Sequence, residues 1–338
     1  MLEAIGKLVR GQNLTEAEAA HAMEVIMKGE ATPSQIAGFV VALRIKGEST
    51  EEITGLVRTA RAYATPIEID ADGLVDTCGT GGDALGTFNI STLSGIVAAA
   101  CGARVAKHGN RAASSQCGSA DVLEALGVRI DLGPDGVARC IAETGIGFLF
   151  APVFHPSFRY ATVPRRELGV RTVFNVLGPL CNPAGAQRQA LGVADEALAG
   201  RMADVLARLG VTHALVFHGA DGMDELTTTG PSRVIEVSGG ERREYILEPG
   251  DLGLQLAPVA AMRGGGPAEN ATIARQVLEG AKGPRREVVL LNAAAALRVA
   301  GQAGDFKDGI GLAAEAIDSG RAGEVLQRWA KASQAVAA

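Results

Sequence analysis

From about residue 73 onward, short apolar segments alternate with helical stretches separated by glycines, and this alternation limits the folds open to the chain. Six of the short segments are predicted strands: GLVDTCG, RVAKHG, GIGFLF, QALGVA, THALVFHG and SRVIEV. Strands alternating with helices are typical of an α/β domain with a central, mostly parallel sheet, in which ligands bind in loops at the strand ends. We therefore expect the functional residues to follow strands.

The first 65 residues show a different pattern, because three capping boxes that start helices follow one another. They begin at Thr15, Thr32 and Ser49, each with Glu or Gln three residues later and an apolar run beyond. A later stretch rich in Pro and Arg interrupts the α/β alternation and is expected to return to this helical block. The sequence thus predicts a small helical minor domain over 1–70, with a returning segment at about 160–185, and a larger α/β major domain over 71–338.

Charge and composition narrow the class of protein. The 32 Lys and Arg against 38 Asp and Glu give a formal net charge of −6, which disfavours general binding to nucleic acid or to an anionic membrane. Five scattered cysteines without C-x-x-C spacing argue against a disulfide framework and against a zinc site. No apolar run reaches about 18 residues, and the N-terminal stretch lacks the pattern of a secretory signal. We expect a cytoplasmic protein.

The first candidate site is the glycine-rich segment GTGGD, residues 79–83, directly after the predicted strand LVDTC. Glycines allow backbone N–H groups to approach a phosphate, and a helix N-terminus completes such an anion site. The hydroxyl-rich segment 87–92, which includes Asn89, opens the next predicted helix. These features favour phosphate binding over the alternative, a glycine-rich turn followed by a Ser/Thr helix cap.

The second candidate site, KHGNRAASS at residues 107–115, follows the predicted strand ARVAK. Lys107 and Arg111 among small residues suit a polyphosphate, because they offer one compact and one bidentate cation. Asp121, further along, begins the helical pattern DVLEALG, so a role as a first-turn carboxylate is at least as well supported as a role in the site.

Two further pairs supply charge. Asp224 and Glu225 follow the strand ALVFH, and their oxygens suit Mg²⁺, which also binds substrate phosphates and water. Arg165 and Arg166 could bind a carboxylate, although a helix face salt-bridged to Glu167 fits the spacing equally well. Together these motifs describe a substrate with phosphates and a metal, without the nucleophile and base expected of a hydrolase.

Several long motifs then carry a family resemblance: DTCGTGGDALGTFNIST, VAKHGNRAASSQCGSADVLEALG, FNVLGPLCNPA, DGMDELTTTGPS and PAENA with LNAAAAL. Together they resemble the anthranilate phosphoribosyltransferases over essentially the whole chain. The resemblance implies Mg²⁺-dependent transfer of the 5-phosphoribosyl group from 5-phosphoribosyl 1-pyrophosphate to the amine of anthranilate, in tryptophan biosynthesis. It also implies a homodimer, with a helical minor domain and an α/β major domain in each subunit.

The resemblance also implies roles for individual residues. The metal would be bound by Ser91, Asp224 and Glu225. Anthranilate would be bound by Gly79, His108, Asn110 and Arg165. No side chain acts as a nucleophile or strong base, and Lys107 and His108 lie nearest to that role. The phosphoribosyl donor would be bound by Gly79, Gly82, Asp83, Thr87, Asn89, Ile90, Ser91, Thr92, Lys107, His108, Gly109, Asn110, Arg111, Ala112, Ala113, Ser114, Ser115 and Ser119.

Some positions depart from the family pattern, and two other functions remain open. Cys117 and Cys181 stand where Ser or Thr is expected, and GGGP at 264–267 lacks an acidic residue often found there. These departures raise the question of how sensitive the cysteines are, but they do not argue against the activity. A pyrimidine nucleoside phosphorylase shares the architecture, but HGNRAASS and DELTTTGP favour the transferase. A catalytically silent relative that binds nucleic acid is disfavoured by the intact pair Asp224 and Glu225 and by the negative charge.

Overall fold

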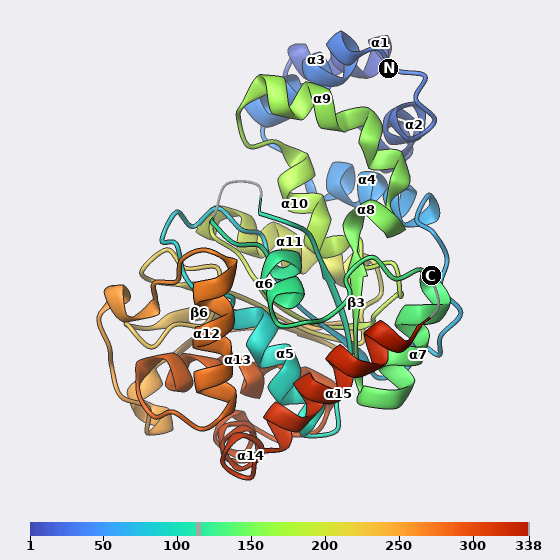
Figure 1. Ribbon diagram of the computed structural model, residues 1–338. Helices are drawn as coiled ribbons and strands as arrows, with labels where there is room; N and C mark the ends of the chain where they lie inside the picture. Colours follow the sequence, from blue (N-terminus) through green and yellow to red (C-terminus); the bar gives the residue numbers. More distant parts are fainter. Residues whose placement is uncertain (113–115, 337–338) are drawn as a thin grey trace.

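The computed structural model describes residues 1–112 and 116–336, and its centre is a seven-stranded sheet (Figure 1). The strand order is β3-β2-β1-β4-β5-β6-β7. The strands from β3 to β5 in this order are parallel to one another, whereas β6 is antiparallel to β5 and β7 is antiparallel to β6. This confirms the predicted α/β class. The strands are β1 (Leu74–Gly79), β2 (Arg104–Gly109), β3 (Ile146–Phe150), β4 (Arg188–Gly192), β5 (His213–Gly219), β6 (Ser232–Ser238) and β7 (Glu241–Leu247).

The six predicted strands are present, and β7 is the one that the sequence reasoning missed. Its sequence, ERREYIL, is mostly polar because β7 is an exposed edge strand. The turn between β6 and β7 consists of Gly239 and Gly240, with φ of 58° and 85°. Positive φ at both turn positions is what a tight β-hairpin requires.

One face of the sheet is covered by helices that follow β1 and β2, together with helices from the C-terminal part of the chain. In Figure 1, α13 and α5 lie against the sheet with α12, α14 and α15 outside them. Most of α13 is buried, as expected for a helix packed between the sheet and other helices. These helices are α5 (Ile90–Ala100), α6 (Ser119–Ala125), α7 (Pro134–Thr144), α12 (Pro267–Leu278), α13 (Pro284–Ala300), α14 (Phe306–Asp318) and α15 (Arg321–Ala335), with short 3₁₀ turns at Pro249–Leu252 and Val259–Met262.

The opposite face carries α11 and the helical block at the top of Figure 1. All three capping boxes are present, with each hydroxyl accepting a hydrogen bond from the N–H three residues later. α9 packs against α3, and α10 against α4, so the Pro- and Arg-rich stretch lies with the first helices. The helices are α1 (Leu2–Val9), α2 (Glu16–Met27), α3 (Pro33–Lys46), α4 (Thr50–Ala62), α8 (Ala151–Phe154), α9 (Arg159–Leu168), α10 (Val173–Leu180) and α11 (Glu196–Arg208), with a 3₁₀ turn at Pro156–Phe158.

A single apolar cluster joins the helical block to the sheet. It runs from Met23 and Phe39 through Leu177 to Val216 and Ile235 on the strands. This shared core holds the helices at the edge of the sheet where its functional loops emerge. None of the helices in the described ranges is both long and apolar enough to span a membrane.

We expect Glu52→Ala to destabilise the helical block strongly. The Glu52 carboxylate is buried and accepts hydrogen bonds from Leu14 N at 2.8 Å, Ser49 N at 2.7 Å and Lys46 Nζ at 2.8 Å. Its removal leaves the buried ammonium of Lys46 without its counter-ion. This loss should lower the free energy of unfolding by about 3–5 kcal/mol. Chemical denaturation measures the loss. Glu51→Ala, next in sequence but in an exposed pair, is the control and should cost far less; equal losses would contradict the expectation.

Candidate active site

A cavity of about 300 Å³ opens at the carboxyl ends of β1 and β2, close to β4. The chain turns from one side of β1 to the other at this point, which is where open α/β sheets bind ligands. Ala113, Ser114 and Ser115 lie outside the described residues, and Arg165 does not line the cavity. The predicted residues that do line it are Gly79, Gly82, Asp83, Thr87, Asn89, Ile90, Ser91, Thr92, Lys107, His108, Gly109, Asn110, Arg111, Ala112, Ser119, Asp224 and Glu225.

The acidic loop after β5 sits directly on the ends of β1 and β4. Asp224 Oδ2 accepts a hydrogen bond of 2.7 Å from the N–H of Gly81 in the glycine-rich loop. A Cβ on Gly79 would lie 2.2 Å from Asp224 Oδ2, and one on Gly192 would lie 1.7 Å from Asp224 O. Gly192 therefore has to be glycine for the acidic loop to lie here, and a side chain at position 79 would displace the Asp224 carboxylate.

The next carboxylate is held against the start of α5. Glu225 Oε1 accepts a hydrogen bond of 3.0 Å from the N–H of Ser91. Asn292, from the LNAAAAL motif, fixes the following residue: its Oδ1 accepts from Leu226 N at 3.0 Å and its Nδ2 donates to Leu226 O at 2.8 Å. The three residues predicted to bind metal thus lie together.

Three carboxylates crowd this part of the cavity. Burial raises the pKa of Asp224 to about 7, and repulsion from Asp83 adds to the effect. Burial and then the charge of Asp224 raise the pKa of Glu225, while Lys107 opposes the shift. A divalent cation would relieve this repulsion. The described residues hold no complete cluster of three His, Cys, Asp or Glu ligands, so a cation here would need hydroxyl, water or phosphate ligands, as Mg²⁺ accepts.

The second loop contributes a buried lysine and histidine. Lys107 Nζ donates to Thr77 O and, at 3.3 Å, to Ser91 Oγ, so its ammonium is anchored beside the metal candidates. His108 Nδ1 lies 3.2 Å from Gly178 O, and burial lowers the pKa of His108 to about 3. The imidazole is therefore neutral near pH 7, and its Nε2 has no partner within the described part of the chain.

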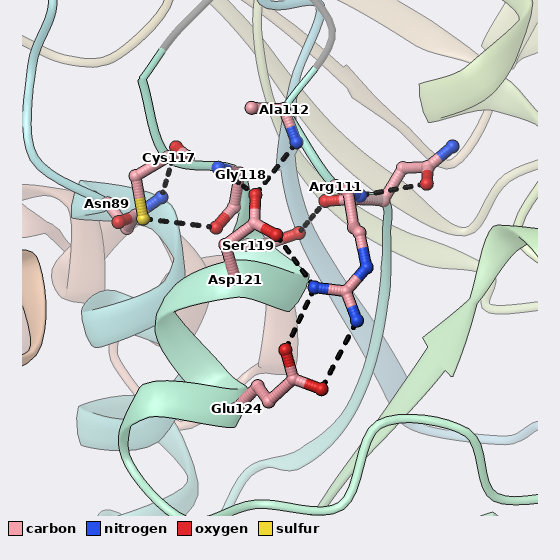
Figure 2. Close-up of polar contacts among 9 residues, drawn as sticks. Asn89, Arg111, Ala112, Cys117, Gly118, Ser119, Asp121 and Glu124 are labelled. Carbon is pink, nitrogen blue, oxygen red and sulfur yellow. Dashed lines mark hydrogen bonds and ion pairs between the residues drawn. The ribbon is translucent and has the colours of Figure 1, made fainter. Parts of the chain in front are cut away.

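Arg111 forms ion pairs with two carboxylates of α6. Figure 2 shows its guanidinium bound to Asp121 Oδ1 and Glu124 Oε2, each at 2.9 Å. Asp121 Oδ2 in turn accepts from Gly118 N and Ala112 N at 2.9 Å. Of the two interpretations of Asp121, the structure supports the first-turn carboxylate, which caps α6 and also accepts from Ala112 N.

Amide side chains connect the surrounding loops. Asn89 Nδ2 donates to Cys117 O at 3.1 Å (Figure 2), and Asn270 Nδ2, from the PAENA motif, donates to Asn89 Oδ1 at 2.9 Å. Asn270 Oδ1 also accepts from Gly265 N at 2.8 Å. The start of α5 is thus held in place by hydrogen bonds to the loop at Cys117 and to the helix α12.

The cysteines that depart from the family pattern are buried. All five cysteines are free, as predicted. Burial raises the pKa of Cys117 to about 11 and that of Cys181 to about 12. Their thiols stay protonated near neutral pH and are poor nucleophiles there.

The two neighbouring arginines of α9, Arg165 and Arg166, do not line this cavity. Arg165, on α9, lies with its guanidinium carbon 5.2 Å from the centroid of the Phe174 ring, and no ion pair joins Arg165 or Arg166 to Glu167 in the described ranges. Arg171 and Asn175 line the cavity instead, and the sequence reasoning missed both. Asn175 Oδ1 accepts from Thr172 N at 3.0 Å at the start of α10. The capping pattern Thr172-x-x-Asn175 could have pointed to this segment.

Comparison with known proteins agrees with this arrangement. Residues 2–64 match the helical bundle domain of a glycosyl transferase family, and residues 71–323 match the α/β domain of that family. Anthranilate phosphoribosyltransferase 2 of Streptomyces coelicolor is 59% identical, covering 95% of this chain and 96% of its own length. The enzyme of Moorella thermoacetica is 56% identical, covering 97% of each chain.

Solved structures show the same fold. The anthranilate phosphoribosyltransferase of Thermus thermophilus superimposes with a TM-score of 0.93 at 48% identity, covering 98% of this chain and 99% of its own. That of Saccharomyces cerevisiae, in complex with PRPP and Mg, superimposes with a TM-score of 0.91 at 27% identity, covering 99% and 98%. By sequence and by fold, this chain belongs to the anthranilate phosphoribosyltransferase family.

Proposed function

We propose that this protein transfers the 5-phosphoribosyl group from 5-phosphoribosyl 1-pyrophosphate to the amine of anthranilate, releasing pyrophosphate, with Mg²⁺ as cofactor. The observation that supports this proposal most directly is the position of the acidic pair. Asp224 is hydrogen-bonded to the glycine-rich loop and Glu225 to the start of α5, and both line one cavity at the switch point of the sheet. The yeast relative binds PRPP and Mg in one structure and 4-fluoroanthranilate in another, which supports the same substrates here.

The proposed roles follow the loops. The donor's diphosphate would lie on the GTGGD loop and at the start of α5, because a glycine-rich loop that leads into a helix N-terminus is typical of phosphate sites. Residues 107–115 and Ser119 of the second loop would complete the donor pocket. The metal would be bound by Ser91, Asp224 and Glu225. Anthranilate would be bound by Gly79, His108, Asn110 and Arg165.

The chemistry needs placement and charge more than acid–base groups. The neutral amine of anthranilate attacks C1′ of the ribose as the bond from C1′ to pyrophosphate breaks, and the protonated product nitrogen then loses its proton to water or a nearby group. The cavity therefore has to hold the two reactants together and keep competing water away from C1′. Bound Mg²⁺ supplies positive charge to the departing pyrophosphate. Lys107, anchored beside Ser91, adds positive charge at the same place. The neutral His108 and Asn110 offer hydrogen-bonding groups on the acceptor side.

The direct test is the loss of anthranilate fluorescence when the purified protein is mixed with 5-phosphoribosyl 1-pyrophosphate, with Mg²⁺ and again with a chelator. We expect consumption that the chelator abolishes. A folded protein that consumes no anthranilate would contradict the proposal. Thymidine with phosphate, and a salt-dependent DNA-binding assay, then test the phosphorylase and the silent binder.

Arg165→Ala should mainly raise the KM for anthranilate. The proposed partner of the Arg165 guanidinium is the carboxylate of anthranilate, and the loss of a charge-assisted hydrogen bond costs about 1.5–3 kcal/mol, or roughly 10- to 100-fold. Steady-state kinetics with each substrate varied in turn measures the effect. A loss confined to the phosphoribosyl donor would move Arg165 to the other pocket.

The same proposal covers assembly and domain limits. We take the chain to be a cytoplasmic homodimer, with a helical minor domain over 1–70 and about 160–185 and an α/β major domain over 71–338. The helical block exposes Val9 on α1, Ile45 at the end of α3 and Val163 on α9, at 73%, 81% and 43%. These apolar side chains would be covered in a dimer, and sedimentation at varied concentration tests the mass.

A further inference from the structure

Arg171 reaches the glycine-rich loop from the helical side of the cavity. It lies between α9 and α10, just after the helix-ending Gly169, and it lines the same cavity as the acidic pair. A Cβ on Gly82 would lie 1.4 Å from Arg171 Nη1 and 2.5 Å from its Cζ. The guanidinium therefore lies directly on the loop backbone, in space that only a glycine leaves open.

Arg171 differs from the other cations of the cavity because its guanidinium has no partner among the described residues. Lys107 donates to Thr77 O and Ser91 Oγ, and Arg111 is bound to two carboxylates. Arg171 is exposed, and within residues 1–112 and 116–336 its guanidinium makes no hydrogen bond or ion pair. The charge of Arg171 acts on the Asp83 carboxylate. Burial raises the pKa of Asp83, and attraction to Arg171 opposes that rise.

We infer that Arg171 binds the diphosphate of the phosphoribosyl donor, holding it on the GTGGD loop from the helical side. A planar guanidinium binds phosphate oxygens through two parallel hydrogen bonds, and a bound diphosphate would supply the acceptors that the chain itself does not. Because Arg171 belongs to the segment between α9 and α10, this contact also ties the helical block to the donor loop. The inference rests on the proposed function for the identity of the donor.

Binding of inorganic pyrophosphate in the presence of Mg²⁺, measured by isothermal titration calorimetry, tests the contact without catalysis. Arg171→Ala should weaken binding at least about tenfold. Arg171→Lys keeps the positive charge but lacks the paired N–H donors of the guanidinium, so its affinity for pyrophosphate should lie between those of the unaltered protein and Arg171→Ala. The matched control is Arg159→Ala, an exposed arginine of α9 whose guanidinium donates to Tyr160 Oη, and it should bind pyrophosphate as the unaltered protein does.

Kinetics then separates this role from a structural one. In Arg171→Ala, the KM for 5-phosphoribosyl 1-pyrophosphate should rise while the KM for anthranilate stays the same. Unchanged pyrophosphate affinity, or a rise confined to the KM for anthranilate, would overturn the inference. If Arg171→Ala fails to fold, Arg171→Gln serves in its place. If the unaltered protein binds pyrophosphate tightly but transfers nothing to anthranilate, the proposed function fails while the Arg171 contact is still decided by the calorimetry.

Discussion

Replacing Asp224 and Glu225 together, by Asn and Gln, should lower turnover by about 10²-fold or more and leave the fold intact. The amides keep the size of the side chains and can still accept from Gly81 N and Ser91 N, but they remove both negative charges. Loss of the metal's charge stabilisation, worth several kcal/mol, accounts for the effect on rate. Because the replacement also removes crowded buried carboxylates, the free energy of unfolding without metal should not fall.

Turnover across a Mg²⁺ titration, together with chemical denaturation, measures both parts of this prediction. The control is Glu248→Gln with Asp251→Asn, the same chemical change at two exposed carboxylates next to a 3₁₀ turn outside the cavity. This control variant should titrate with Mg²⁺ as the unaltered protein does. Near-unchanged kinetics in the Asp224 and Glu225 variant would count against the metal site and against the proposed reaction.

Gly192→Ala should damage activity more than any other single methyl group placed on a strand end. The new Cβ would lie 1.7 Å from Asp224 O, 2.4 Å from Asp224 C and 3.2 Å from Glu225 N. All three are backbone atoms, so no side-chain rotation relieves the clash, and the acidic loop has to move. A displacement of about 1 Å can cost roughly 10²-fold in rate, and overpacking typically costs about 1–3 kcal/mol in unfolding free energy.

Steady-state kinetics and denaturation of Gly192→Ala check the effect. Gly311→Ala is the control, because a Cβ there meets nothing within 4 Å and the residue lies inside the helix α14. Alanine has the higher helix propensity, so Gly311→Ala should be neutral or stabilising by up to about 1 kcal/mol. Unaltered turnover in Gly192→Ala would show that the close seating of Asp224 is not required.

Local patterns explain why so much of the fold could be predicted. Thr15, Thr32 and Ser49 cap helices through hydrogen bonds to the residue three positions later. Four consecutive residues are therefore enough to predict where each helix starts. The buried parallel strands are short apolar runs between glycines. The exposed edge strand β7 lacks such a run, because its pairing with β6 depends on the backbone and on the turn at Gly239 and Gly240.

The candidate site was predictable to the extent that it consists of loops after strands. Because the carboxyl ends of β1, β2 and β5 face the same side of a parallel sheet, residues such as Gly79, Lys107 and Asp224 could be expected to meet. The positions of Arg165 and Arg171 could not be predicted in this way. Both lie in a helical segment whose orientation is set by packing on α2, α3 and α4, not by the sheet.

The sequence by itself determined the helix starts, the six core strands, the glycine-rich and acidic loops and the family, because each depends on residues close together in the chain. Only the tertiary structure decided that Asp121 also binds Ala112 and Arg111, that Arg171 lies on Gly82, and that Gly192 leaves room for Asp224. Those contacts join residues from nine to 89 positions apart. They form only when the core common to the helices and the sheet brings the loops together, and no local pattern of side chains encodes that approach.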